Sequence, residues 1–256
     1  ITITENESAP TVTLSIKIDS AGYDYITAFA YENDSSKSLK LEATLSGATD
    51  EDVTVALSTS GTATEGTDYT DGSGNLDDIT ISAGSTTGSV NFTLTDDSVY
   101  EGDETATIAI SSVSGGSATE SGSQSVTITI RDNESAGSVT LTVSATSIAE
   151  NAGTSLTITA TLSSTSDEDV TVALSTSGTA TEGTDYTDGS GVIDDITISA
   201  GDTTGTVNFT PTDDSVYEGN ETATIAISSV SGGDASENGD QSVTVTITEN
   251  ESAPTV

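Results

Sequence analysis

The sequence predicts an all-β protein built from two tandem β-sandwiches, and three features support this prediction. Apolar and polar residues alternate over short segments such as Val53–Leu57 and Val90–Leu94, which is typical of strands with one buried face. Clusters of Gly, Ser, Asp and Thr separate these segments at turn spacing, and no segment has a helical period. The third feature is an internal repeat.

The repeat has the length of a domain. Residues 50–74 recur letter for letter at 167–191, and the DDSVYEG segment at Asp96 recurs at Asp213, with the same offset of 117 residues. Such a repeat indicates one folding unit copied in tandem. Each copy spans roughly 120 residues with about seven short strands, which fits a two-sheet Greek-key sandwich of the immunoglobulin type.

The strands of the first copy follow one another as alternating segments. After the two named above, the pattern continues over Thr105–Val113 and Ser125–Ile130. The turn residues of Ser114–Gly122 separate these two, so we expect them to run antiparallel. The second copy begins its first strand at Val139–Val143 and keeps the same order.

We place the first sandwich at residues 10–135 and the second at 136–253. Residues 1–9 resemble the closing segment of the second copy, so we predict that they are the last strand of a preceding repeat. Residues 254–256 match the start of the first copy and are predicted to begin a following repeat. We therefore expect the chain to be a segment of a longer array.

The first copy carries ten extra residues within 19–31. The segment holds four aromatic residues: Tyr23, Tyr25, Phe29 and Tyr31. We favour an extended hairpin whose aromatic side chains cover a sheet edge or pack on the sheet. The alternative is a binding loop for a surface ligand, which would leave these side chains exposed.

Composition excludes several classes of function. Four basic residues against 42 acidic ones give a net charge of −38, which repels nucleic acid and anionic membranes. The chain has no Cys and no His, so it lacks disulfides, imidazole ligands and imidazole bases. It also lacks a Gly-x-Ser-x-Gly motif that would activate a serine. We therefore expect no enzyme, no membrane contact and a monomer.

Carboxylates gather in loops at one end of each predicted sandwich. The Asp96–Glu101 loop follows the strand Val90–Leu94, and antiparallel pairing brings Asp132–Glu134 to the same end. Bare charges there would repel by about 1 kcal/mol or more per pair. Oxygen ligands without His or Cys favour calcium over zinc or copper. Magnesium and solvated acidic turns are the alternatives.

Several motifs are similar to those of a known family. They are Glu-Asn-Ala-Gly at Glu150, Gly-Thr-Ala-Thr-Glu-Gly-Thr-Asp-Tyr ending at Tyr69 and Tyr186, and the closing strands with acidic ends, Ile130–Glu134 and Ile247–Glu251. With these motifs the chain resembles tandem Calx-beta domains, a sandwich module of sodium–calcium exchangers, an integrin and very large bacterial surface proteins. The resemblance covers nearly the whole chain outside the extra residues.

The resemblance implies calcium ligands at matched positions in both copies. In the first copy they are Glu32, Asp68, Asp96, Asp97, Val99 (through its carbonyl), Glu101, Asp132, Asn133 and Glu134. In the second copy they are Glu150, Asp185, Asp213, Asp214, Val216 (through its carbonyl), Glu218, Glu249 and Glu251. The first copy reads Tyr-Glu-Asn-Asp around Glu32, a departure from the family motif, and the number of ions per domain stays open.

Four tyrosines flank the acidic loops, namely Tyr69, Tyr100, Tyr186 and Tyr217. Sandwich tyrosines usually bury the ring and hydrogen-bond the hydroxyl, so we expect structural roles for all four.

These features predict a calcium-loaded spacer. The resemblance to large type I-secreted adhesins of the RTX kind implies an extracellular place on a bacterial surface, where two sandwiches form a stiffened rod segment that projects a distal binding domain. Calcium and neighbouring repeats of the same chain are the expected partners. Two alternatives remain: a ligand-binding adhesin module that uses the aromatic segment, and a salt-adapted acidic sandwich without a specific metal.

Overall fold

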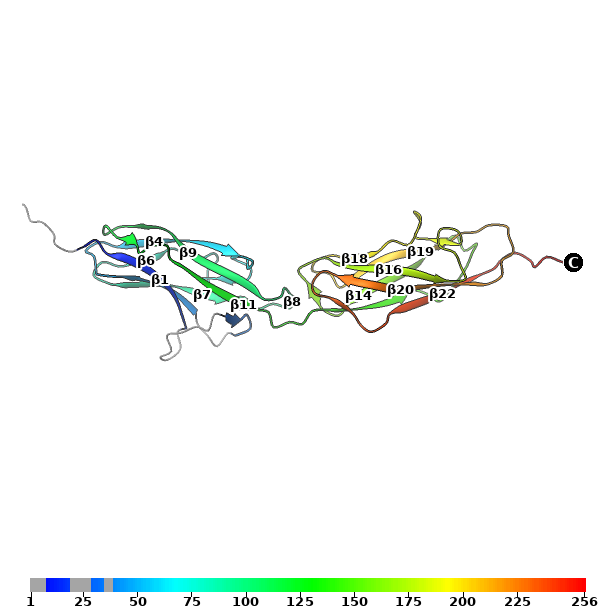
Figure 1. Ribbon diagram of the computed structural model, residues 1–256, viewed down its shortest axis with the longest axis horizontal. Helices are drawn as coiled ribbons and strands as arrows, with labels where there is room; N and C mark the ends of the chain where they lie inside the picture. The colour runs from blue at the N-terminus through cyan, green and yellow to red at the C-terminus, as the bar shows by residue number, and fades with distance from the viewer. Residues whose placement is uncertain (1–7, 19–28, 35–38) are drawn as a thin grey trace, which may run out of the picture. The chain divides into compact units, whose positions relative to one another are not determined.

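The protein is described by a computed structural model that covers residues 8–18, 29–34 and 39–256 (Figure 1). All regular structure in these residues is β-strand, which confirms the predicted all-β class. No helix of the length and hydrophobicity that a bilayer requires occurs in the described residues. The chain divides into two compact units: one runs up to Asp97 and includes Asp103–Asn133, and the other combines Ser98–Gly102 with Glu134–Val256.

The first unit is a two-sheet sandwich. Its strands are β1 (Thr11–Ile18), β2 (Phe29–Tyr31), β3 (Leu39–Leu45), β4 (Val53–Gly61), β5 (Tyr69–Thr70), β6 (Ile79–Ile81), β7 (Thr87–Leu94), β9 (Glu104–Ser114), β10 (Thr119–Glu120) and β11 (Ser125–Arg131). One sheet has the order β10-β1-β3-β7-β5 and the other β2-β11-β9-β4-β6. The non-sequential order of both sheets agrees with the expected Greek-key sandwich.

The second unit repeats the two five-stranded sheets of the first and adds one two-stranded pairing. Its strands are β8 (Val99–Tyr100), β12 (Ser138–Val143), β13 (Ser147–Ala149), β14 (Leu156–Leu162), β15 (Thr165–Ser166), β16 (Val170–Gly178), β17 (Tyr186–Thr187), β18 (Ile196–Ile198), β19 (Thr204–Pro211), β20 (Glu221–Ser231), β21 (Ser236–Glu237) and β22 (Ser242–Thr248). The sheets have the orders β17-β19-β14-β12-β21 and β13-β22-β20-β16-β18, and β15 pairs with β8.

Short edge strands account for most of the difference from the predicted seven strands per domain. β5, β10, β17 and β21 each contain two residues, which is too few for an alternating pattern to be visible in the sequence. Their positions depend on neighbouring strands that are distant in the chain. β10, for example, pairs in parallel with β1 through Thr11↔Thr119.

Each unit has its own apolar core between the two sheets. The alternating residues predicted to face inward are buried, as in the burial pattern of β3, where every second residue is inaccessible. Tyr69 stacks on Phe92 with ring centres 4.9 Å apart, and Tyr186 stacks on Phe209 at 4.7 Å. Both tyrosines are 1% exposed, as expected of structural residues. Tyr217 is 44% exposed, so the expectation of a buried ring was wrong there.

The aromatic segment of the first copy lies only partly within the described residues. Tyr23 and Tyr25 fall outside them. Phe29–Tyr31 form β2, which pairs in parallel with β11 as β13 pairs with β22, so these three residues are the counterpart of β13. The Arg131 guanidinium carbon lies 3.7 Å from the centre of the Phe29 ring. Tyr31 is 42% exposed, so β2 covers the sheet edge and leaves one aromatic ring partly accessible.

Candidate metal centres

In the described part of the chain, four groups of acidic residues each bring three carboxylates together. In each group one oxygen per residue lies within 4.8 Å of the others. The groups in the first copy are Glu32, Asp132, Glu134 and Asp68, Glu101, Glu104; those in the second copy are Glu150, Glu249, Glu251 and Asp185, Glu218, Glu221. The groups match in pairs between the copies, so the repeat carries its acidic sites with it.

Strand pairing builds the Glu150 group. Glu150 follows β13, and Glu249 and Glu251 follow β22. Because β13 and β22 pair in parallel, with Ile148 opposite Ile247, both strands end at the same side of the sheet. Their next residues therefore meet. β2 and β11 do the same in the first unit, where the Asn133 N–H donates to Glu32 Oε1 at 3.2 Å.

The Asp185 group lies beside the Glu150 group. Glu221 opens β20 and is paired with Ile247 of β22, so the start of β20 adjoins the end of β22. Asp185 comes directly before β17, and its Oδ2 accepts the Thr181 N–H at 2.6 Å. The Glu218 N–H donates to Glu249 Oε2 at 2.6 Å and thereby joins the two groups. One acidic end thus holds both groups of the second copy.

Neighbouring carboxylates perturb one another strongly at this end. Backbone N–H groups of Glu251, Glu218 and Gly219 donate to the Glu249 carboxylate and lower its pKa to about 2. The hydrogen bond that Glu251 shares with the Glu249 carboxylate, followed by burial, raises the pKa of Glu251 to about 7. Burial raises the pKa of Glu150, and the nearby Asp185 charge raises the pKa of Glu218. The raised pKa values of Glu150 and Glu218 mean that burial and neighbouring charge oppose ionisation of these two carboxyl groups.

No basic side chain in the second copy offsets this negative charge. From Ala136 onward the sequence contains neither Lys nor Arg. Glu150 is 9% exposed, and within the described residues Glu150 Oε1 and Glu251 Oε2 are buried without a hydrogen-bond partner. Buried polar atoms without partners are rare in native proteins, and a bound ion is one of the features that explain them. Carboxylate oxygens alone, without His or Cys, suit a hard cation such as calcium.

Many predicted ligands converge, and some lie outside the four groups. Asp213 and Asp214 act at a distance, since their charges help to raise the pKa of Glu150. Asp214 Oδ1 accepts the Val216 N–H at 2.6 Å. Asp96, Asp97, Asn133 and the two valines, Val99 and Val216, contribute no carboxylate to a group. As ligands these residues remain predictions.

Glu104 and Glu221 belong to the groups but were missed in the sequence. Each is the first residue of a long strand, β9 or β20, whereas the predicted strand of the first copy begins one residue later, at Thr105. The sequence does contain a signal that they could be ligands. Each lies three residues after a predicted ligand, Glu101 or Glu218, and this spacing is the same in both copies.

Comparison with known proteins identifies a domain family. The Calx-beta domain matches residues 19–134 and again residues 132–251. No curated protein matches the chain.

Solved structures match most of the chain at low identity and with low TM-scores. The crystal structure of CBD12 from CALX1.2 matches over 91% of this chain and 98% of that chain, with 19% identity and a TM-score of 0.37. The Yersinia pseudotuberculosis adhesin InvE matches over 94% of this chain and 58% of its own, with 13% identity and a TM-score of 0.34. Invasin, a bacterial integrin-binding protein, matches over 94% and 40%, with 18% identity and a TM-score of 0.39.

The raised pKa of Glu251 predicts a pH dependence for the calcium-free protein. Its pKa rises from 4.5 to about 7 on folding, so between these values the folded state holds a proton that the unfolded state has released. This stabilisation is complete below pH 4.5 and is lost as the pH rises through 7. In calcium-free buffer, Tm should therefore fall over this window relative to Glu251→Gln, whose side chain stays neutral. If Tm depended on pH in the same way in the two proteins, the raised pKa of Glu251 would be contradicted.

Proposed function

The chain belongs to the Calx-beta family, and from this premise we propose that both of its domains bind calcium and together form a spacer segment of an extracellular protein. The observation that carries the proposal is the Glu150, Glu249, Glu251 group. It combines buried carboxylate oxygens that lack a partner with a domain that has no basic residue. A bound cation would satisfy those oxygens and cancel the repulsion.

Calcium fits this donor set better than other common metals. The sites offer carboxylate and carbonyl oxygens only, because the chain has no Cys and no His. Zinc and copper favour nitrogen and sulfur ligands, and magnesium demands a tighter octahedral shell with more waters. The residues that would hold calcium in the second domain are Glu150, Asp185, Glu218, Glu221, Glu249 and Glu251, with Asp213 and Asp214 beside them.

The calcium sites would act through stability and stiffness. A site with a Kd of about 10 µM in about 1 mM calcium stabilises the folded state by about 2.7 kcal/mol. Asp132–Glu134 end the first repeat only a few residues before β12 begins at Ser138. A cation held by these carboxylates would restrict the connection between the domains. The charges of the short acidic linker would then coordinate the ion instead of repelling the neighbouring loops.

We place this spacer in a repetitive adhesin on a bacterial surface. Nearly identical tandem copies suit a module that supplies length. Calx-beta domains serve as binding and structural modules, and the acidic ends lack a nucleophile paired with a base. The chain would therefore project a distal binding domain and perform no catalysis.

A second candidate function is ligand binding by the first domain. It is favoured by Tyr31, which is 42% exposed beside Phe29 and Arg131. An exposed aromatic ring next to a guanidinium is a common contact for a sugar or a peptide. A third interpretation is salt adaptation without a specific metal. It predicts that a chelator leaves the melting curve unchanged.

Removing calcium should lower the melting temperature. A loss of about 2.7 kcal/mol of binding stabilisation corresponds to a shift of about 10 °C for a domain of this size. Calorimetry in calcium and in a chelator measures the shift, and added sodium at equal ionic strength should not reverse it. An unchanged melting curve after thorough chelation would support salt adaptation instead.

Removing ligands of the second domain should affect that domain alone. Glu150→Gln combined with Glu249→Gln should weaken calcium binding there by at least about tenfold, or about 1.4 kcal/mol, because two carboxylate ligands lose their charge. Titration calorimetry measures this loss. Asp202→Asn, at an exposed acid of the same domain, is the control and should bind like the parent protein. Equal loss at the sites of both domains would disprove independent sites.

Calcium should also stiffen the connection between the domains. With calcium bound, small-angle scattering should show a narrower distribution of maximum dimensions, centred on longer values, than in chelator. Superimposable profiles in the two conditions would rule out the stiffening mechanism while leaving calcium stabilisation of each domain intact.

A further inference from the structure

The two copies differ at their acidic ends by a pair of charged residues. By the offset of the repeat, Asp103 stands where the second copy has Asn220. Arg131 stands where it has Thr248. The first copy thus has one extra negative and one extra positive charge at this end. Arg131 is the last residue of β11 and comes directly before the predicted ligand Asp132.

Arg131 joins three segments of the first unit. Its guanidinium carbon lies 3.7 Å from the centre of the Phe29 ring and 5.8 Å from that of the Tyr31 ring, both in β2. Its Nε lies 3.7 Å from Asp103 Oδ2, in the turn before β9. A planar guanidinium stacks on aromatic rings and pairs with a carboxylate at the same time. This side chain therefore ties the edge strand β2 to β11 and to the turn before β9.

The core holds the two matching edge strands unequally. The middle residue of each strand is buried: Ala30 in β2 is 3% exposed, and Ile148 in β13 is 8% exposed. An isoleucine buries more apolar area than an alanine and so stabilises its strand more. Ser147 and Ala149 flank Ile148 and carry no ring. β13 thus depends on its apolar anchor, whereas β2 has a weaker anchor and the contacts of Arg131.

The turn that carries Glu32 keeps its shape, although its letters depart from the family motif. The Asp34 N–H donates to the Tyr31 carbonyl at 3.1 Å, as the Ala152 N–H does to the Ala149 carbonyl at 3.0 Å. Glu32 is 7% exposed and directly follows β2. The position of β2 therefore decides where this carboxylate lies.

Repulsion within the group acts against that position. Oxygens of Glu32, Asp132 and Glu134 lie within 4.8 Å of one another, and like charges at this distance push the end of β2 away from the end of β11. β2 has three residues, so few backbone bonds oppose this force. The Glu32 N–H donates to the Arg131 carbonyl at 3.1 Å, next to the side chain that holds the strand.

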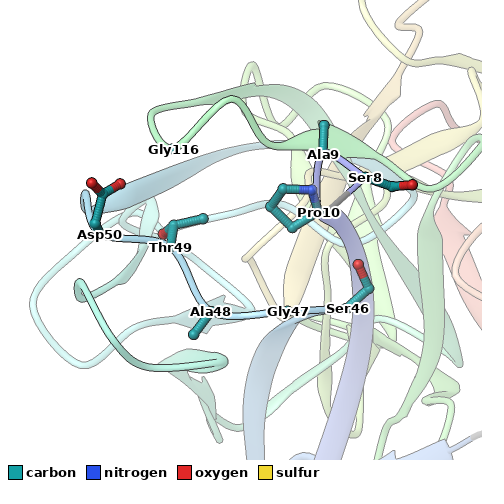
Figure 2. A pocket seen from close by; sticks show the side chains of 9 residues that line it. All are labelled: Ser8, Ala9, Pro10, Ser46, Gly47, Ala48, Thr49, Asp50 and Gly116. Atoms are coloured by element: carbon teal, nitrogen blue, oxygen red, sulfur yellow. The ribbon is translucent and has the colours of Figure 1, made fainter. Parts of the chain in front are cut away.

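The hollow in Figure 2 offers no comparable contact. It has a volume of about 800 Å³ and lies where β1 begins and β3 ends. Small residues, three hydroxyl side chains and the Asp50 carboxylate line it, and the described lining includes no aromatic ring and no basic group. Among the described residues, both cation–aromatic contacts belong to Arg131, at the end of the unit that carries the Glu32 group.

We propose that Arg131 is a positioning residue for the calcium group of the first domain: by stacking on β2 and pairing with Asp103, it holds the Glu32 carboxylate in place. This inference rests on the proposed function, because Glu32 matters here as a calcium ligand. Removing a residue that orients a metal ligand typically lowers metal affinity by roughly 10- to 100-fold. The second domain reaches the same arrangement through Ile148.

Arg131 acts through position and not through net charge. A cation beside the group would by itself repel calcium, but the Asp103 carboxylate offsets it. Replacing both residues by their counterparts, Arg131→Thr with Asp103→Asn, leaves the net charge of the chain unchanged. The second unit forms the same two five-stranded sheets with these counterparts, so the fold accepts them. A changed calcium affinity in this variant therefore reports the loss of the contacts of Arg131.

Hydrogen exchange followed by mass spectrometry during a calcium titration tests the proposal in the full chain. Residues 29–34 and 147–152 differ in sequence, so the two domains are measured separately. In the Arg131→Thr, Asp103→Asn variant, the calcium concentration that half-protects residues 29–34 should rise by about tenfold. Residues 147–152 are the internal reference and should keep the midpoint of the parent protein.

Lys17→Ser with Glu42→Thr is the matched control. It also removes an ion pair from the first domain. It likewise introduces the residues of the second copy, Ser144 and Thr159, without a change of net charge. Because this pair lies on the other sheet, the midpoint of residues 29–34 should equal that of the parent protein.

An unchanged midpoint of residues 29–34 in the Arg131→Thr, Asp103→Asn variant would overturn the proposal. Equally accelerated exchange in β3 would also overturn it, because the two residues would then stabilise the whole domain and not the position of Glu32. If calcium protected neither segment of the parent protein, the proposed function itself would fail. That result differs from an unchanged midpoint, in which calcium binds the first domain without help from Arg131.

Discussion

Repulsion among carboxylates that share one end of a sandwich is the constraint on which the rest of this structure depends. In the second domain, Glu150, Glu249 and Glu251 meet with Asp185, Glu218 and Glu221 close by, and no basic residue occurs in that domain. The chain relieves part of the repulsion by itself: backbone N–H groups solvate Glu249, and Glu251 keeps a proton up to about pH 7. In the proposed function, a bound cation satisfies the buried oxygens that stay without partners.

The sheets create this constraint because they bring distant residues together. Parallel pairing of β13 with β22 and antiparallel pairing of β20 with β22 bring the ends of β13 and β22 and the start of β20 to one place. Moving any of these strands by one residue would turn its buried face outward, so the core holds the register and the register holds the carboxylates. The apolar core thereby supplies the free energy that keeps like charges in contact. Calcium, in the proposed function, turns that cost into stabilisation.

The repeat has consequences at both ends of a domain. Duplication preserves the acidic groups, and it also preserves the short SVY strand and the edge that it covers in the second unit. A protein made of such copies has in each repeat both an edge and a strand that fits it.

The sequence by itself determined the all-β class, the duplication, the inward-facing residues of the long strands and the acidic character of the loops. These follow from local alternation and from matched letters, which need no knowledge of the fold. Only the tertiary structure decided that the carboxylates form two adjacent groups per domain, that Glu104 and Glu221 belong to them, and that Tyr217 is exposed while Tyr100 is paired. The physical reason is that these properties depend on which strands become neighbours. Pairing between segments far apart in the chain is set by the packing of the whole domain and leaves no periodic signal in any one segment.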